Sequence, residues 1–247
     1  MRFFIDTANL EEIRKAKGYG LIDGVTTNPS LFARESQDWR KLAEAICKEV
    51  DGPVSLEVIA TTAKEMLKEA RELVKFGPNV VVKIPMTMEG LAAIRELKTM
   101  DIPVNCTLVF TPVQALLAAK AGAAFVSPFV GRLDDILHTG LDCVADIVTI
   151  FDNYALDTDI LVASVRNPLH IQEAALLGAD VVTVPFNVLE RIARHPLTDL
   201  GLATFLKDWE KAPGAKAAKP AAPAKKAAAA KASPAKGAST RKSAKKK

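Results

Sequence analysis

The stretch VVVKIP, residues 80–85, is the clearest indication of the fold. Its apolar, mostly β-branched side chains surround one lysine, and such runs are typical of a strand that is buried on both faces of a sheet. Similar runs recur along the chain, starting at Phe3, Gly24, Val54, Val104, Phe125, Asp159 and Val181. The starts lie 21 to 34 residues apart, and segments with helical periodicity such as DWRKLAEAICKEV fill the gaps. This repeated strand–helix–strand unit predicts an α/β fold with a parallel sheet.

Two architectures are built from such units, a (β/α)8 TIM barrel and a doubly wound open sheet. No GxGxxG motif follows the first run and no Walker motif occurs in the chain. The features typical of nucleotide-binding open sheets are therefore missing. Eight units in about 205 residues also fit the lower end of the barrel size range. We therefore predict a TIM barrel.

The charge of the chain is divided between two parts. The whole chain has 33 Lys and Arg residues and 29 Asp and Glu residues, a net charge of +4. Twelve of the basic residues and none of the acidic ones fall in 211–247, so residues 1–210 carry a net charge of −8. The positive excess therefore does not make the body a nucleic-acid-binding domain. We predict a barrel with a C-terminal helix over 1–211 and a disordered Lys/Ala/Pro-rich tail over 212–247.

The composition also excludes several classes of protein. No apolar run approaches the roughly 18–20 residues that span a bilayer, and the first residues lack the layout of a signal peptide, so a cytoplasmic protein is expected. Cys47, Cys106 and Cys143 are widely separated, which indicates reduced thiols rather than disulfides or a zinc site. No cluster of histidines and carboxylates with metal-ligand spacing occurs, so no metal is expected.

Polar residues collect at the ends of the predicted strands. Each of the following lies at or just after a different run: Asp6, Asn28, Glu57, Lys83, Thr107, Arg132 and Ser164. The active sites of TIM barrels lie at the C-terminal ends of their strands. The sequence therefore predicts a convergent polar site at that end.

Lys83 is the sharpest of these residues because it interrupts an otherwise apolar strand. A buried ammonium loses its hydration, which favours the neutral amine that attacks carbonyl groups. The alternative is a lysine that reaches solvent or pairs with a carboxylate. The hydroxyl and carboxyl groups at neighbouring strand ends favour a Schiff-base lysine.

Two carboxylates are candidates for proton transfer. Asn9 and Glu12 have the spacing of a capping box for the first helix, which leaves Asp6 free to act as an acid and base. Glu57 lies between apolar neighbours, so it either forms a structural ion pair with Lys83 or activates a water together with Thr107.

A phosphate site is expected in the loops after the sixth and seventh strands. Late loops of TIM barrels often bind phosphate, and guanidinium forks match phosphate oxygens. Arg132, Ser164 and Arg166 fall in these loops, although each arginine has a solvated surface side chain as its alternative. Asn28 precedes Pro29, so it is also a plain helix N-cap.

Together these motifs resemble one family. DTAN, TTNPS, SLEV, VVVKIP, NCTLVF, SPFVGRLDD and ASVRN occur in this order and cover essentially all of residues 1–210. They closely resemble the transaldolase and fructose-6-phosphate aldolase family.

The resemblance implies a class I aldolase-type barrel in which Lys83 forms the Schiff base and neither a metal nor an organic cofactor is needed. It implies that Asp6 is the acid and base, and that Glu57 and Thr107 hold the catalytic water. The substrate-binding residues that it implies are Thr26, Asn28, Asn105, Ser127, Phe129, Arg132, Ser164 and Arg166. It also implies a homo-oligomer, a pentamer or decamer, in which the C-terminal helix around 202–211 packs on a neighbouring subunit.

Within the family, Glu57, Phe129 and Arg166 resemble the transaldolase branch rather than the aldolase branch, which has Gln and Tyr at the first two positions. The expected reaction transfers a dihydroxyacetone unit from sedoheptulose 7-phosphate or fructose 6-phosphate to glyceraldehyde 3-phosphate or erythrose 4-phosphate, as in the pentose phosphate pathway. One alternative is a fructose-6-phosphate aldolase that releases free dihydroxyacetone. Another is a polyanion-binding protein on an inactive barrel.

The tail contains only Ala, Lys, Pro, Gly, Ser, Thr and Arg over 212–247. Its alternation of Lys with Ala and Pro resembles linker-histone tails, which bind polyanions by counterion release without reading sequence. Non-specific nucleic-acid contact through 212–247 is therefore one expectation. A neutral, solubilising extension is the other.

Overall fold

A computed structural model describes residues 1–213 of the chain. The chain divides into two compact units, Met1–His195 and the part from Pro196 onward. The barrel and the C-terminal helix, predicted as one domain over 1–211, therefore fall in different units. The tail predicted over 212–247 lies outside the described residues from 214 onward.

The unit Met1–His195 is a closed barrel of eight parallel strands that pair in chain order, β1 to β8, with β8 returning to β1. This confirms the predicted TIM barrel. Seven strands begin at the predicted residue, and the first begins one residue earlier. The strands are β1 (Arg2–Asp6), β2 (Gly24–Thr26), β3 (Val54–Glu57), β4 (Val80–Pro85), β5 (Val104–Val109), β6 (Phe125–Pro128), β7 (Asp159–Val162) and β8 (Val181–Val184).

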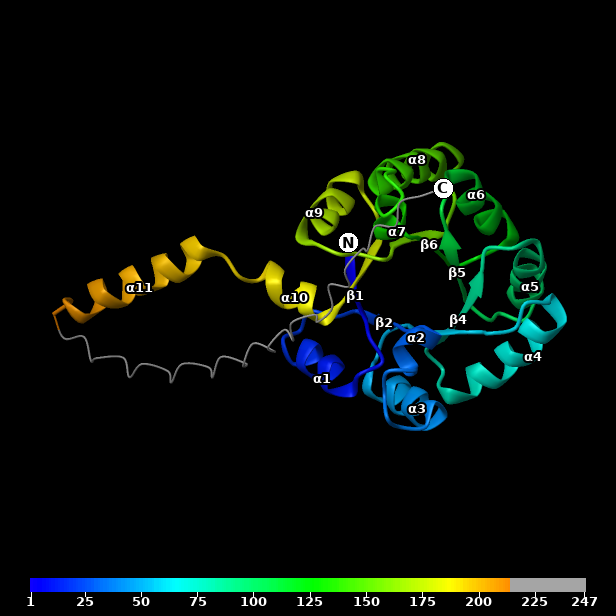
Figure 1. Ribbon diagram of the computed structural model, residues 1–247, viewed down its shortest axis with the longest axis horizontal. Helices are drawn as coiled ribbons and strands as arrows, with labels where there is room; N and C mark the ends of the chain where they lie inside the picture. The colour runs from blue at the N-terminus through cyan, green and yellow to red at the C-terminus, as the bar shows by residue number, and fades with distance from the viewer. Residues whose placement is uncertain (214–247) are drawn as a thin grey trace, which may run out of the picture. The chain divides into compact units, whose positions relative to one another are not determined.

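Helices surround the ring of strands (Figure 1). In this unit they are α1 (Leu10–Gly18), α2 (Pro29–Phe32), α3 (Trp39–Glu49), α4 (Ala63–Leu73) with the 3-10 turn η1 (Val74–Phe76), α5 (Met88–Thr99), α6 (Pro112–Ala121), α7 (Val130–Asp134), α8 (Gly140–Tyr154), α9 (Pro168–Leu177) and α10 (Phe186–Ile192). Most begin at a side chain that caps free backbone N–H groups, such as Asp38, Thr62 and Thr111. Gly122 and Gly178 end α6 and α9 in the left-handed conformation that glycine adopts without strain.

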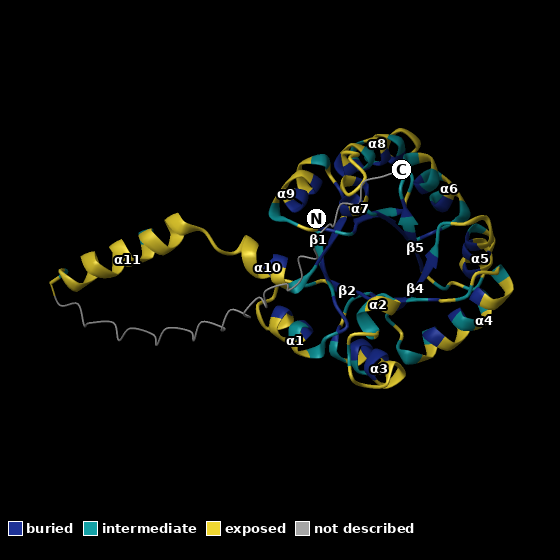
Figure 2. Ribbon diagram, in the orientation of Figure 1, coloured by how far each residue is buried: buried dark blue, intermediate teal, exposed yellow. Residues whose placement is uncertain are grey.

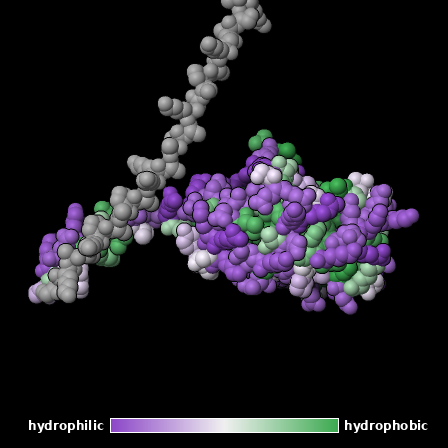
Figure 3. Space-filling view, turned by 90° about the horizontal axis from the view of Figure 1, so that it is seen from below, coloured by the Kyte–Doolittle hydropathy of each residue, from purple (hydrophilic) through white to green (hydrophobic). Residues whose placement is uncertain are grey.

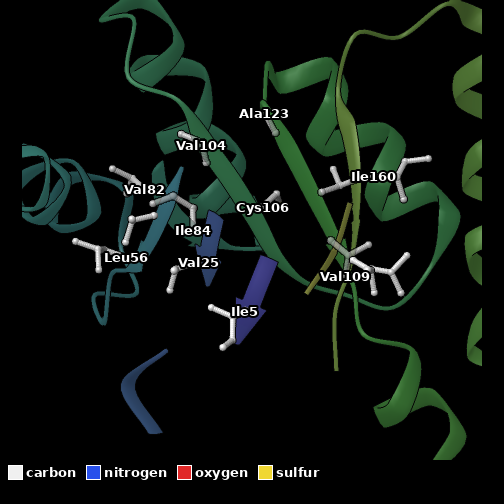
Figure 4. Close-up of a cluster of buried hydrophobic side chains, with 14 of the residues drawn as sticks. Ile5, Val25, Leu56, Val82, Ile84, Val104, Cys106, Val109, Ala123 and Ile160 are labelled. Carbon is white, nitrogen blue, oxygen red and sulfur yellow. The ribbon is translucent and has the colours of Figure 1, made fainter. Parts of the chain in front are cut away.

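The larger core lies between the strands and the helices. Ile5, Leu56, Val82 and Cys106 belong to it (Figure 4), and they pack with helix residues such as Ile46. The burial pattern in Figure 2 shows the same arrangement, with dark, buried strands and helices that are exposed on their outer sides. This core explains why the outward-facing strand residues are apolar.

A second, smaller core fills the inside of the barrel. Its members come from strands or their ends: Phe4, Val81, Phe125, Leu161, Ala163 and Val181. Gly24 makes room for one of them, because a Cβ at this residue would lie 2.7 Å from the Phe4 ring. Side chains two positions apart on a strand point to the same face. The inward residues that follow Phe4, Val81 and Phe125 are therefore Asp6, Lys83 and Ser127, and all three are polar. The inside of the barrel is therefore apolar at its N-terminal end and polar at its C-terminal end.

The surface of the barrel unit is mainly hydrophilic, with separate apolar patches on the face shown in Figure 3. The second unit contains α11 (Pro196–Glu210), which begins earlier than the helix predicted around 202–211. Leu200, Phe205 and Trp209 of α11 are exposed. Among the described helices, none has the length and apolar character required to cross a membrane.

Candidate active site

A cavity opens at the C-terminal ends of the strands. It has two compartments of about 760 Å³ and about 210 Å³, and both are lined by Asp6, Asn28, Lys83, Phe129 and Arg132. Four further predicted residues line the smaller compartment, Thr26, Ser127, Ser164 and Arg166, whereas Glu57 lines the larger one. The predicted convergence of polar groups from different strand ends is therefore present.

Lys83 lies inside this cavity and is only 5% exposed. Its Nζ lies 2.9 Å from a carboxylate oxygen of Glu57 and donates to the Thr27 carbonyl at 3.1 Å. The strand register explains the ion pair, because Glu57 on β3 and Lys83 on β4 are paired residues of parallel strands. The two sequence-based interpretations of Glu57 are compatible, since the carboxylate pairs with Lys83 and also faces the cavity.

Asp6 is the second acidic group of the cavity. It accepts a hydrogen bond of 2.8 Å from Thr26 Oγ1, which lies 2.6 Å from Thr183 Oγ1. Burial raises the pKa of Asp6 above its usual range, and the positive charge of Lys83 and the bond from Thr26 counter only part of this effect. A raised pKa makes the carboxylate a stronger base, which suits a group that removes a proton from the substrate. We call Asp6, Thr26, Glu57 and Lys83 the lysine site.

Asn105 and Thr107 of β5 are fully buried beside the lysine site. Asn105 is paired with Lys83 in the strand register, and it donates to Ser55 Oγ at 3.1 Å and accepts from Ser127 Oγ at 2.7 Å. Thr107 Oγ1 has no hydrogen-bond partner among residues 1–213. Neither β5 residue lines the two compartments, whereas Ser127 lines the smaller one.

Phe129 lies between the lysine site and a group of more exposed residues. Its ring centroid is 6.0 Å from Lys83 Nζ and 5.4 Å from the Arg132 guanidinium carbon. Arg132, Ser164 and Arg166 form this outer group, which we call the arginine rim. The Arg166 side chain is 52% exposed and binds both carboxylate oxygens of Asp135, at 3.0 and 2.7 Å.

Two helix starts near the cavity differ from a simple capping pattern. Asn28 caps α2 by accepting from Leu31 N–H at 3.0 Å, and it also lines both compartments. Asn9 caps α1, but Glu12 accepts from the Thr7 hydroxyl at 2.6 Å and does not complete the predicted capping box. The N–H of Asn9 donates to Thr7 Oγ1 at 3.1 Å instead of to Glu12, and Asp6 does not cap the helix.

Several residues of the site were not predicted from the sequence. Thr183 is the polar residue of the eighth strand, for which no strand-end residue was predicted, and the run VVTVP contained that signal. Arg34, in the turn after α2, and Asn187, in the first turn of α10, line the larger compartment, but no sequence pattern singles them out. Asp135 was missed because its contact with Arg166 joins side chains 31 residues apart.

The described residues contain no group of three or more His, Cys, Asp or Glu side chains that could hold a metal ion. Cys47, Cys106 and Cys143 are free thiols, as the sequence predicts.

Known proteins with similar sequences show the family to which the chain belongs. Residues 3–239 match the family described as Transaldolase/Fructose-6-phosphate aldolase. A "Probable transaldolase" of Maridesulfovibrio salexigens is 63% identical over 211 residues, which cover 85% of this chain and 99% of that protein. Proteins of the same name from Moorella thermoacetica and Aquifex aeolicus are 60% and 57% identical over 85% and 86% of this chain and 98% of their own lengths. The chain is an enzyme that belongs to the transaldolase/fructose-6-phosphate aldolase family.

Proposed function

We propose that this enzyme is a transaldolase that acts through a Schiff base on Lys83. The observation that carries the proposal is a buried amine 2.9 Å from the Glu57 carboxylate, in a cavity that it shares with Asp6. A lysine held away from solvent beside a proton acceptor is suited to attack a carbonyl group. Class I aldol chemistry requires this combination of an amine nucleophile and a separate acid and base.

The first half of the reaction cleaves the donor ketose phosphate. Glu57 takes a proton from the Lys83 ammonium, and the neutral amine attacks the C2 carbonyl to give a carbinolamine. Protonated Glu57 returns the proton to the carbinolamine hydroxyl, which leaves as water and gives an iminium. Asp6 removes the proton of the C4 hydroxyl, the C3–C4 bond breaks, and its electron pair moves into the iminium to give an enamine. The aldose phosphate leaves, and the three-carbon dihydroxyacetone unit stays on Lys83.

The second half transfers this unit to an acceptor aldose phosphate. The enamine carbon attacks the acceptor aldehyde, Asp6 returns its proton to the new hydroxyl, and water hydrolyses the iminium. We propose that Glu57 and Thr107 hold this water. Thr107 is suited to that role because its buried hydroxyl lacks a partner among the described residues.

The remaining polar residues are proposed to bind substrate. Thr26, Asn28, Asn105 and Ser127 would contact the dihydroxyacetone unit, and Phe129 would form the wall. The arginine rim would bind the phosphate of donor and acceptor, because guanidinium groups bind phosphate oxygens in pairs.

We propose the substrates named above, sedoheptulose 7-phosphate or fructose 6-phosphate as donor and glyceraldehyde 3-phosphate or erythrose 4-phosphate as acceptor, in the cytoplasmic pentose phosphate pathway. The test measures glyceraldehyde 3-phosphate release from fructose 6-phosphate with and without erythrose 4-phosphate. Transaldolase activity predicts one equivalent per active site without acceptor and continuous release with it. Continuous release of dihydroxyacetone without acceptor would instead establish the aldolase alternative.

We also propose that the enzyme is a homo-oligomer, a pentamer or decamer, assembled through α11. Leu200, Phe205 and Trp209 of this helix are 63%, 73% and 56% exposed, and a second copy of the chain would cover them. Light scattering after size exclusion should give a multiple of the 26.5 kDa chain mass. The Phe205→Glu variant should reduce that multiple, and a monomeric wild-type enzyme would contradict the proposal.

The basic tail supports a second proposed function, non-specific binding of duplex DNA. Residues 211–247 carry twelve basic and no acidic residues, and the transaldolase relatives are matched over 98–99% of their lengths by only 85–86% of this chain. Such a segment binds duplex DNA by releasing counterions. Gel retardation should weaken steeply with salt and disappear when the chain ends at Lys211, while transfer activity stays unchanged. Retardation by the truncated enzyme would contradict the proposal.

A further inference from the structure

The β7–α9 loop, which carries Ser164 and Arg166, is attached to α7 by its backbone. Val130 N–H donates to the Ala163 carbonyl at 3.1 Å, and Gly131 N–H donates to the Ser164 carbonyl at 3.2 Å. The backbone at Ser164 is in the left-handed region, with φ of 60°. Helix α7 therefore fixes the first residues of this loop, Ala163 and Ser164, which line the smaller compartment of the cavity.

The Arg166 side chain lies across α7. A Cβ at Gly131 would lie 2.7 Å from Arg166 Cγ and 2.8 Å from its Nε, so the absent side chain of Gly131 leaves the space that the arginine stem occupies. The guanidinium then reaches Asp135, one helical turn after Gly131, and binds both of its carboxylate oxygens at 3.0 and 2.7 Å. The side chain is thus held at its stem and at its end.

Asp134 holds the same loop from the adjacent position. Its carboxylate lies 2.9 Å from Nε2 of His170, a buried residue in the first turn of α9. The other oxygen accepts from Gly140 N–H at 2.9 Å, which fixes the carboxylate. The two consecutive aspartates at the end of α7 thus contact successive parts of the β7–α9 segment.

From this geometry we infer that Asp135 and Gly131 are positioning residues. They hold the Arg166 side chain where it binds the phosphate group of the substrate. The inference rests on the proposed role of Arg166 in phosphate binding. A free arginine side chain loses rotamer entropy when it is fixed, and Asp135 fixes it before the substrate arrives. The contact uses two of the five N–H donors of the guanidinium, so three remain for phosphate.

A direct electrostatic effect of Asp135 would have the opposite sign. A carboxylate near the arginine rim repels phosphate, so its removal would strengthen binding if repulsion were the larger effect. At half-exposed positions solvent screens that repulsion, whereas the bidentate contact defines where Arg166 lies. We therefore expect the loss of Asp135 to weaken phosphate recognition.

The experiment compares acceptors with and without phosphate. With sedoheptulose 7-phosphate as donor, kcat/KM is measured from erythrose 4-phosphate release for glyceraldehyde 3-phosphate and for glyceraldehyde as acceptors. The ratio of the two values reports phosphate preference. We expect Asp135→Asn to lower this ratio about fivefold by raising KM for glyceraldehyde 3-phosphate, with kcat unchanged. Asp135→Glu should lower the ratio too, because its longer side chain no longer places both carboxylate oxygens against the Arg166 guanidinium. Asp152→Asn, an equal charge change at the C-terminal end of α8, is the matched control and should leave the ratio unchanged.

A double-mutant cycle with Arg166→Ala separates the possible outcomes. If Asp135 acts through Arg166, the effect of Asp135→Asn disappears in the Arg166→Ala background. An unchanged or higher ratio in Asp135→Asn, or an effect that persists without Arg166, would overturn the inference. If Arg166→Ala itself leaves the ratio unchanged, the proposed phosphate role of Arg166 is wrong, which is a different result.

Discussion

The lysine site and the arginine rim belong to one cavity but are held in place in different ways. Residues of the lysine site are fixed by strand register: Lys83 pairs with Glu57 across β3 and β4, and Asp6 pairs with Thr26 across β1 and β2. Residues of the rim lie on short α7 and a loop, and side-chain contacts such as Arg166–Asp135 fix them. The comparison indicates that the backbone positions the chemistry, whereas adjustable surface contacts position the recognition of phosphate.

The largest effect is expected from Lys83→Met. Removal of the nucleophile should lower kcat by about 10⁴-fold or more, as for other covalent catalysts. The variant also leaves the Glu57 carboxylate without its partner, and breaking a buried pair costs about 3–5 kcal/mol of stability. Lys83→Met combined with Glu57→Gln is therefore the control for folding, by thermal unfolding, and it should be inactive as well. Activity near the wild-type level in either variant would contradict the assignment of Lys83.

Asp6→Asn should produce the next largest effect, a fall in kcat of roughly 10²- to 10⁴-fold from loss of the acid and base. The same substitution should stabilise the fold. Because the pKa of Asp6 is raised from 3.8 by burial, the folded protein binds this proton more tightly than the unfolded chain. Ionised Asp6 therefore lowers stability at pH 7, and that loss is absent below pH 3.8.

Denaturant unfolding of wild type and Asp6→Asn across pH 3.5 to 7.5 measures this difference. The variant should be the more stable protein at neutral pH, and its advantage should vanish toward acidic pH. An advantage that grows as the pH falls would show that the pKa of Asp6 is lowered, not raised.

Gly131→Ala tests the arginine rim with a smaller effect. The added Cβ would lie 2.3 Å from the Ser164 carbonyl oxygen and 2.7 Å from Arg166 Cγ, so the loop must shift. We expect KM for glyceraldehyde 3-phosphate to rise about tenfold, with little change for glyceraldehyde, because the lysine site is not displaced. Gly18→Ala is the control, since its Cβ would meet nothing within 4 Å. Equal losses with both acceptors would contradict the separation of the two regions.

The core between the strands and the helices can be tested without any change in activity. Burial raises the pKa of Cys106, on β5, to about 12 and that of Cys47 to about 11. Alkylation by iodoacetamide at pH 8 should be at least about 100-fold slower than for free cysteine, as measured by peptide mass spectrometry. Modification of Cys106 at the rate of a free thiol would show that the barrel opens on that side.

Most of the fold and the lysine site could be predicted because both depend on one periodic pattern. The apolar runs define the strands, and a polar residue at the end of a run necessarily faces the cavity when it lies two positions after an inward apolar residue, as Lys83 follows Val81. Thr183 was missed because threonine is an ordinary strand residue, whereas a lysine inside an apolar run is not. Asp135 and His170 were missed because their contacts cross between loops, and no local pattern records such pairs.

The central claim, a Schiff base on Lys83, is tested most directly by trapping with borohydride. The wild-type enzyme is mixed with fructose 6-phosphate, reduced, digested and examined by peptide mass spectrometry. We predict a three-carbon dihydroxyacetone adduct, reduced onto the peptide that contains Lys83, in near-stoichiometric amount, and no adduct in Lys83→Met. An unmodified Lys83 in enzyme that demonstrably binds the substrate would contradict the Schiff-base mechanism.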